Sequence, residues 1–158
     1  MPHEYLVGLI SDTHGLVRPE VFTALDGVEL ILHAGDVGDG VLEELAAIAP
    51  VRAVYGNTDA PGDPALAAAL EQMVGGVRVH VSHGHELGSP TPEKLLAAYD
   101  ADVLVYGHTH RPLLVNVGGR WVVNPGAAGQ RRFDLVPSVA RMRISNREIE
   151  IAHISLTP

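Results

Sequence analysis

The chain of 158 residues carries 19 acidic and 11 basic side chains, a net charge of −8 with histidine neutral, and it has no cysteine. This charge argues against a general nucleic-acid-binding surface, because a phosphate backbone would be repelled. The absence of cysteine excludes disulfides and thiolate metal sites. No apolar run reaches the about 18 residues of a membrane span, and residues 1–4 lack a signal-peptide pattern. We therefore expect one cytoplasmic domain over residues 1–158 that does not bind membranes.

The first third of the chain predicts alternating strands and helices. Three apolar runs of strand length are expected to form strands: 5–10, 29–34 and 51–55. One helix is expected to begin at Pro19, and a second to contain Val41 and end before Pro50. This order is typical of a parallel sheet with right-handed crossovers.

Later segments predict a mixed arrangement. Asp63 and Pro64 are expected to open a short helix that extends to residue 74, where two glycines end it. A strand over 77–82, a helix over 92–99 with Thr91 as N-cap, and a strand over 103–106 follow. Two hairpins are expected at the end, 113–117 with 120–123 and 137–144 with 147–154. The expected fold is α/β, with two packed mixed β-sheets flanked by helices.

Five of the expected strands end in polar side chains that commonly bind metals. In chain order these are Asp12 and His14, Asp36, Asn57, His83 and His85, and His108 and His110. Open α/β sheets bind ligands beyond the carboxyl ends of their strands, so we expect these side chains to meet at one edge. Carboxylate and imidazole without thiolate favour Mn, Fe, Co, Ni or Zn over Mg or Ca. The sequence thus predicts a two-metal hydrolase site in which Asp36 is shared between the ions.

The same motifs, taken in order, resemble the signature of the calcineurin-like metallophosphoesterases, in particular their small single-domain phosphodiesterase branch. They read DTH at 12–14, GDxxD at 35–39, GNTD at 56–59, HGH at 83–85, GHTH at 107–110 and NPG at 124–126. The similarity covers most of the chain. It implies the αββα sandwich of that family and a small phosphate ester as substrate.

The resemblance also implies a set of metal ligands and catalytic residues. One metal would be held by Asp12, His14, Asp36 and His110, and a second by Asp36, Asn57, His83 and His108. Manganese is the expected metal, with Fe, Ni, Co or Zn as alternatives. The implied reaction is in-line attack of a bridging hydroxide on phosphorus, with Asp36 and Asn57 as catalytic residues. We add His85 as a third candidate catalytic residue.

One position departs from the pattern of the larger family members. Many of these have a histidine after the metal-binding asparagine, where it protonates the leaving group, whereas this chain has Thr58. We therefore expect weak activity on alkyl phosphates and better activity on activated aryl esters. His85 is the candidate substitute acid.

Three further histidines have other interpretations. His80 and His153 are expected on strand surfaces. His33 is either a hydrogen-bonded core histidine or a residue that orients a metal ligand.

Several charged residues near the motifs also need an interpretation. Asp39 is expected to be a helix N-cap, and Asp59 to hydrogen-bond a site histidine. Arg131 and Arg132 could contact a substrate phosphate, although such a pair is more often solvated surface.

A second class of function is open. Some members of this family are non-catalytic protein-interaction scaffolds that retain the phosphoesterase fold. Here every ligand position is filled by a competent residue, which favours the enzyme. Hydrolysis of a non-phosphate ester is a weaker alternative. Edge strands in the C-terminal hairpins could pair between subunits, so a homo-oligomer is possible.

Overall fold

Two mixed β-sheets lie face to face in the computed structural model, which describes residues 3–60, 62–132 and 134–157. The six-stranded sheet contains, in spatial order, β11 (Glu148–Ser155), β10 (Ser138–Ser145), β1 (Glu4–Ile10), β2 (Leu30–His33), β3 (Val51–Val54) and β4 (Leu66–Ala67). The five-stranded sheet contains β5 (Ala69–Val74), β6 (Val77–Ser82), β7 (Val103–Val105), β9 (Arg120–Asn124) and β8 (Leu113–Val117).

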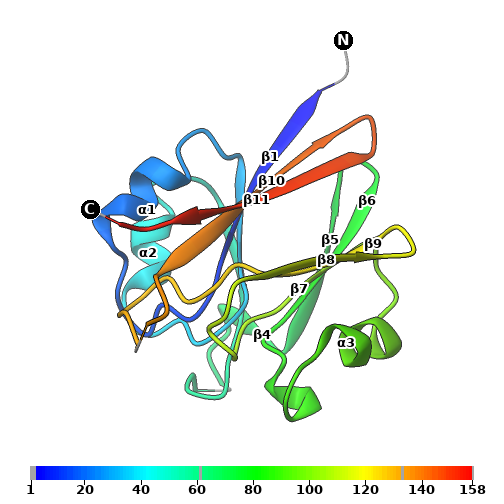
Figure 1. The fold of residues 1–158 in the computed structure, drawn as a ribbon. Coiled ribbons are helices and arrows are strands. Elements are labelled where there is room, and N and C mark those ends of the chain that lie inside the picture. The colour runs from blue at the N-terminus through cyan, green and yellow to red at the C-terminus, as the bar shows by residue number, and fades with distance from the viewer. Residues whose placement is uncertain (1–2, 61, 133, 158) are drawn as a thin grey trace.

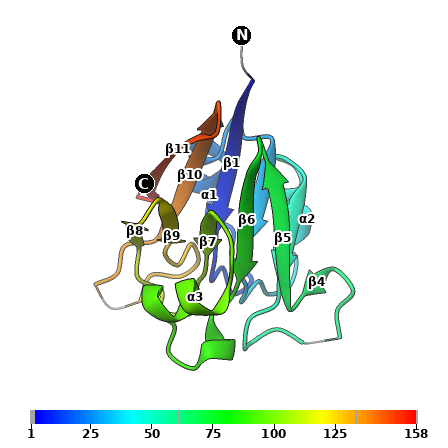
Figure 2. The same cartoon turned by 90° about the vertical axis from the view of Figure 1, so that its right-hand side faces the viewer.

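Short helices cover the outer faces of both sheets. Helices α1 (Pro19–Ala24) and α2 (Val41–Leu45) lie against the six-stranded sheet, and α3 (Pro92–Ala98) lies against the five-stranded one (Figure 1). In Figure 2, α3 lies on the side of β7 and β8, away from β5. A 3₁₀ helix, η1 (His85–Leu87), follows β6. Within the described ranges, no helix has the length and apolar character needed to span a membrane.

The main core fills the space between the sheets. Alternate residues of β6 (Val77, Val79 and Val81) face Val7 and Leu9 of β1, and all five are 3% exposed or less. Alternation of this kind follows from the two-residue period of a strand, which turns every second side chain to the same face. The observed layers confirm the predicted fold class of two packed mixed sheets flanked by helices.

The parallel parts of the sheets determine where the loops meet. β1, β2 and β3 are parallel neighbours, as are β6, β7 and β9. The carboxyl ends of β1, β2, β3, β6 and β7 point to the same end of the sandwich, where the five predicted motifs lie. Loops from both sheets therefore build one site.

The prediction of a helix over residues 64–74 is wrong. The segment forms β4 and β5, and β5 pairs antiparallel with β6. Leu70 and Val74 are both buried, and a spacing of four residues fits one face of a helix and one face of a strand equally well. Gly75 and Gly76 have φ values of 55° and 82°, as a two-residue hairpin turn requires. The glycine pair therefore joins two strands instead of ending a helix.

The other predicted elements hold with small shifts. Thr91 caps α3, since its side-chain oxygen accepts the Lys94 N–H at 3.2 Å. The last hairpin turns at Asn146 and Arg147, one residue later than expected, because both residues adopt positive φ between β10 and β11. Asp39 does not cap α2: Gly40 occupies the N-cap, at φ 79°, without a side-chain hydrogen bond.

Candidate metal centre

The loops after β1 and β2 are held together by backbone hydrogen bonds. The Asp12 N–H donates to the Gly35 carbonyl at 3.0 Å, and the His14 N–H donates to the Asp36 carbonyl at 2.9 Å. In the loop after β7, the Gly107 N–H donates to the His83 carbonyl at 3.0 Å and joins that loop to the end of β6. These bonds fix the backbone from which the candidate ligands project.

Unusual backbone conformations are concentrated at this end of the sandwich. Among the described non-glycine residues, seven have positive φ, and five of them are candidate ligands: Asp12, His14, Asp36, His108 and His110. Each such conformation costs about 1–3 kcal/mol and persists only where surrounding contacts impose it. The strained turns direct side chains from several strands inward, as expected at a functional site.

Four side chains form a compact group that could hold one cation. Ligand atoms of Asp12, His14, Asp36 and His110 all lie within 4.8 Å of one another. Three of them come from the six-stranded sheet and His110 comes from the other. The group is the one that sequence analysis assigned to the first metal.

Asp12 fits a cation ligand in detail. Its Oδ2 accepts hydrogen bonds from the Ser11 hydroxyl at 2.6 Å and from the His108 N–H at 3.2 Å. Its Oδ1 is buried, accepts no hydrogen bond from any described residue, and lies 3.3 Å from His110 Nε2. A buried carboxylate oxygen without a donor is costly unless a cation compensates it. The donor set therefore fits a bound metal. Sequence analysis missed the role of Ser11, which only its contact reveals.

A second group lies beside the first. Asn57 Oδ1 lies 3.1 Å from His83 Nε2 and 3.2 Å from His108 Nδ1. His83 Nε2 lies 3.3 Å from Asp36 Oδ2, and the same oxygen lies 3.2 Å from His14 Nε2. Asp36 Oδ2 thus touches both groups. This is the position that a ligand shared by two ions must occupy.

The site strongly favours the ionised form of Asp36. Burial alone would raise the pKa of its carboxyl, but hydrogen bonds from His83 and from the Thr58 N–H hold the pKa well below its ordinary value. Burial likewise would lower the pKa of His83, yet Asp36 and Asp12 raise it. The pKa of His108 is lowered by burial and by the neighbouring charge of His83. The Asp36 carboxylate is therefore ready to accept a cation at neutral pH.

His33 combines the two roles considered for it. It is fully buried, and its Nδ1 accepts the Gly35 N–H at 3.1 Å, which places the ring proton on Nε2. Nε2 then donates to Thr13 Oγ1 at 2.9 Å, and the Thr13 hydroxyl donates to the Val37 carbonyl at 2.7 Å. Since Thr13 stands between Asp12 and His14, His33 supports the loop that carries two candidate ligands.

Acid should destabilise the metal-free protein through His33. Burial lowers its pKa from 6.5 to about 4, so the unfolded chain binds this proton near pH 6.5 and the folded chain only near pH 4. The free energy of unfolding should therefore fall by up to roughly 3 kcal/mol as the pH drops across this window. Urea unfolding at pH 7, 6, 5 and 4 measures it. A His33→Gln variant should lose less stability over the same range; equal losses would contradict the assignment.

Asp59 does not bind a histidine, contrary to expectation. Its carboxylate accepts backbone N–H groups of Val37 (3.0 Å), Gly38 (3.1 Å) and Gly56 (2.9 Å). The first two follow Asp36 in sequence, and the third precedes Asn57. Asp59 therefore joins the loops that carry these two candidate ligands. The two oxygens of this carboxylate are thus occupied by backbone N–H donors.

Replacing Asp59 by asparagine should loosen this connection. The asparagine amide presents a donor where Asp59 presents a second acceptor, so at least one of the three backbone N–H groups loses its partner. We expect a loss of about 1–3 kcal/mol in the free energy of unfolding and a tenfold to about hundredfold weaker metal affinity. Thermal unfolding and calorimetric Mn²⁺ titration measure the two effects. Asp63→Asn, in an exposed turn of the same segment, is the control; equal effects in both variants would refute the connection.

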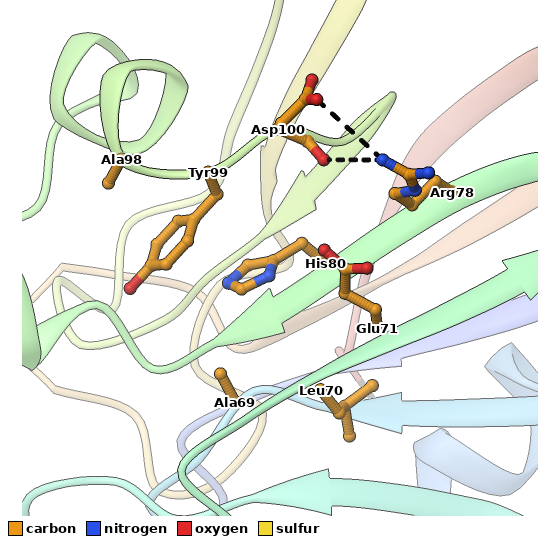
Figure 3. Close-up of a pocket in the computed structure, with 8 residues that line it drawn as sticks. All are labelled: Ala69, Leu70, Glu71, Arg78, His80, Ala98, Tyr99 and Asp100. Carbon is orange, nitrogen blue, oxygen red and sulfur yellow. Dashed lines mark hydrogen bonds and ion pairs between the residues drawn. The ribbon is translucent and has the colours of Figure 1, made fainter.

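Two histidines expected on strand surfaces are more buried than predicted. His80 is 5% exposed because its ring stacks on Tyr99, just beyond α3, with ring centroids 3.9 Å apart. Figure 3 shows this stack beside a pocket of about 430 Å³, which shares no lining residue with the candidate centre. His153 is half-buried, and its Nε2 lies 2.7 Å from the Asn124 carbonyl. The contacts with Tyr99 and with the end of β9 join segments far apart in the chain, so the alternation of the strands does not reveal them.

His85 lies next to the second group. Its ring centroid is 5.3 Å from that of His83 and 6.4 Å from that of His108. Its Nδ1 is buried and has no hydrogen-bond partner among the described residues. The residue is thus close to the candidate centre and has an uncommitted ring nitrogen.

The fold and this aspartate–histidine cluster define the protein class as a metallophosphoesterase. The family model of the calcineurin-like phosphoesterase superfamily domain matches residues 5–147. The chain belongs to that superfamily, and its relatives place it in the small phosphodiesterase branch that the motifs resembled.

Two relatives and one solved structure illustrate the similarity. The chain is 36% identical over 154 residues to a "Probable metallophosphoesterase" of Methanothermobacter thermautotrophicus, which covers 92% of this chain and 89% of the relative. It is 27% identical over 139 residues to a phosphodiesterase of Methanocaldococcus jannaschii, covering 76% and 82%. Vacuolar protein sorting 29 of Cryptosporidium parvum shares the fold, with a TM-score of 0.79 and 24% identity over 96% of this chain and 98% of that one.

Proposed function

We propose that this metallophosphoesterase is a phosphodiesterase that works with two divalent transition-metal ions. The observation that carries the proposal is the position of Asp36 Oδ2, 3.2 Å from His14 Nε2 and 3.3 Å from His83 Nε2. One oxygen between two groups of ligands is the arrangement that a two-metal hydrolase needs.

The ligand assignment follows the two groups. Asp12, His14, Asp36 and His110 would hold one ion, and Asp36, Asn57, His83 and His108 the other. Manganese is the metal we expect, with iron, nickel, cobalt or zinc as alternatives suited to the same donors. When bound, such a pair supplies hydroxide near neutral pH and neutralises phosphate oxygens.

The side chains of the site control charge and protons. The carboxylates of Asp12 and Asp36 offset only half of the charge of two divalent ions, so they leave a local attraction for phosphate in a protein of net charge −8. Thr58 is exposed and cannot donate a proton near neutral pH; its N–H instead orients Asp36 Oδ1 at 3.0 Å. His85 is the candidate group that protonates the leaving oxygen.

The proposal is tested with metal-stripped protein and two chromogenic esters. We expect Mn²⁺ to restore hydrolysis of bis-p-nitrophenyl phosphate, with a preference for this diester over p-nitrophenyl phosphate. Folding of each sample is checked by circular dichroism. Folded protein that hydrolyses neither ester with Mn²⁺, Fe²⁺, Co²⁺, Ni²⁺ or Zn²⁺ would refute the enzyme and leave the scaffold as the working hypothesis.

Thr58 should limit turnover when the leaving group is poor. The enzyme should cleave bis-p-nitrophenyl phosphate far faster than thymidylyl-thymidine, whose leaving group is an alcohol. Thr58→His should raise cleavage of thymidylyl-thymidine at least about tenfold, since general acids contribute about a hundredfold or more. Thr58→Asn, which adds a polar group without a suitable acid, is the control. An equal gain in both variants would contradict the proton-donor explanation.

A further inference from the structure

A pocket opens beside the loop that carries His108 and His110. Its volume is about 280 Å³, and its lining residues are His108, Thr109, His110, Arg111, Arg132 and Leu135. Two of these residues are candidate metal ligands, so the pocket adjoins the candidate centre. A volume near the lower end of ligand pockets suits one arm of a substrate better than a whole substrate.

Two arginines line this pocket, and neither has a counter-charge among the described residues. Among the described residues, neither Arg111 nor Arg132 forms an ion pair, whereas Arg78 and Arg143 pair with carboxylates. Single exposed arginines are ordinary solvated surface. Two that line the same small pocket, in a protein with 19 acidic and 11 basic side chains, are less easily explained this way. Guanidinium groups bind phosphate through paired hydrogen bonds.

Local hydrogen bonds fix the backbone at both arginines, which come from separate segments. The Arg111 N–H donates to Thr109 Oγ1 at 3.3 Å, and the Asn124 side-chain amide donates to the same oxygen at 3.0 Å. On the other segment, the Leu135 N–H donates to the Arg132 carbonyl at 3.0 Å and closes a turn. The neighbouring Arg131 does not line the pocket. The sequence presents Arg131 and Arg132 as one pair, and the structure shows that only Arg132 lines the pocket.

We infer that Arg111 and Arg132 form an anion subsite that binds a second phosphate group, on one arm of a phosphodiester substrate. The inference rests on the proposed function, since the reacting phosphate must sit at the candidate ligands. His108 and His110 belong both to the candidate centre and to the pocket, so a substrate bound at the centre can extend past them to the arginines. Leu135 offers an apolar contact to the part of the substrate that joins the two phosphates. A nucleotide-like diester with a terminal phosphate has this chemistry.

The test compares two substrates that differ only in the second phosphate. These are thymidine 3′-(p-nitrophenyl phosphate) and the same compound with a 5′-phosphate. In both, water adds across the P–O bond to the aryl group: its oxygen joins phosphorus and a proton goes to the released p-nitrophenol. The wild-type protein with Mn²⁺ should show a kcat/KM at least about tenfold higher for the 5′-phosphorylated substrate. Added salt should reduce the preference.

Variants locate the effect. Arg111→Gln and Arg132→Gln should each reduce the preference, and the double variant should bring the two kcat/KM values close together while the rate on bis-p-nitrophenyl phosphate is retained. Arg131→Gln is the matched control and should keep the full preference. Hydrolysis of both nucleotides without preference, or a preference that survives in the double variant, would overturn the subsite and leave the proposed function intact. No hydrolysis of any diester would refute the proposed function and the subsite with it.

Discussion

Replacing Asp36 by asparagine should remove nearly all phosphoesterase activity while the fold persists. Asparagine has nearly the same shape but no charge, and one of its two terminal atoms is an amide nitrogen, which does not bind a cation. Because Asp36 Oδ2 touches both candidate groups, both ions should bind more weakly. We expect kcat/KM for bis-p-nitrophenyl phosphate to fall by more than about a hundredfold, the upper range for residues that only support a ligand.

Calorimetric Mn²⁺ titration should show the same loss directly. The wild-type protein should bind two ions, and Asp36→Asn fewer than two at the same concentrations. Asp39→Asn is the control, since Asp39 is exposed, only three residues away, and outside the cluster. Retained activity in Asp36→Asn, or an equal loss in Asp39→Asn, would contradict a shared ligand at residue 36.

Gly56→Ala should disturb the same carboxylate from the other side. A Cβ atom at Gly56 would collide with Asp36 Oδ1 and lie 2.7 Å from Asp36 Cγ, so the Asp36 side chain has to move. We expect a loss of about 1–3 kcal/mol in the free energy of unfolding, together with weaker Mn²⁺ binding. Chemical denaturation and calorimetry measure the two quantities.

Gly62→Ala is the matched control for this substitution. A Cβ atom there meets no described atom within 4 Å, and the exposed backbone of Gly62 has no positive φ. Its stability should change by less than about 0.5 kcal/mol. If the two alanine variants are equally stable and equally active, close contact between Gly56 and Asp36 does not limit the site.

The sequence by itself determined the elements that place the candidate ligands. Apolar runs of strand length predicted β1, β2, β3, β6 and β7, and each polar motif falls after one of them. This worked because a buried strand has to be apolar, and its carboxyl end is where an α/β sheet binds ligands. The order and spacing of the motifs then indicated the family, which the comparisons confirm.

Local sequence patterns were insufficient where a helix and a strand would bury residues at the same spacing. The burial of Leu70 and Val74 fits a helix or a strand, and pairing of β5 with β6 decided for the strand. The surface prediction for His80 failed for a related reason. A strand pattern tells which face a residue occupies, whereas α3 and Tyr99 decide whether that face is covered.

Only the tertiary structure decided which polar side chains act together. Three features depend on how loops from the two sheets meet. Asp36 Oδ2 contacts histidines of both groups, Asp59 accepts hydrogen bonds from three backbone amides, and Arg132 lines the pocket whereas Arg131 does not. The contacts of Asp36 with the two histidines and of Asp59 with Val37 and Gly38 join residues more than 20 positions apart, so no local spacing encodes them. The adjacent Arg131 and Arg132 differ only in which of them lines the pocket, which the sequence does not show. Sequence supplied the ligand types and their place at strand ends, and the packing of the two sheets fixed their partners.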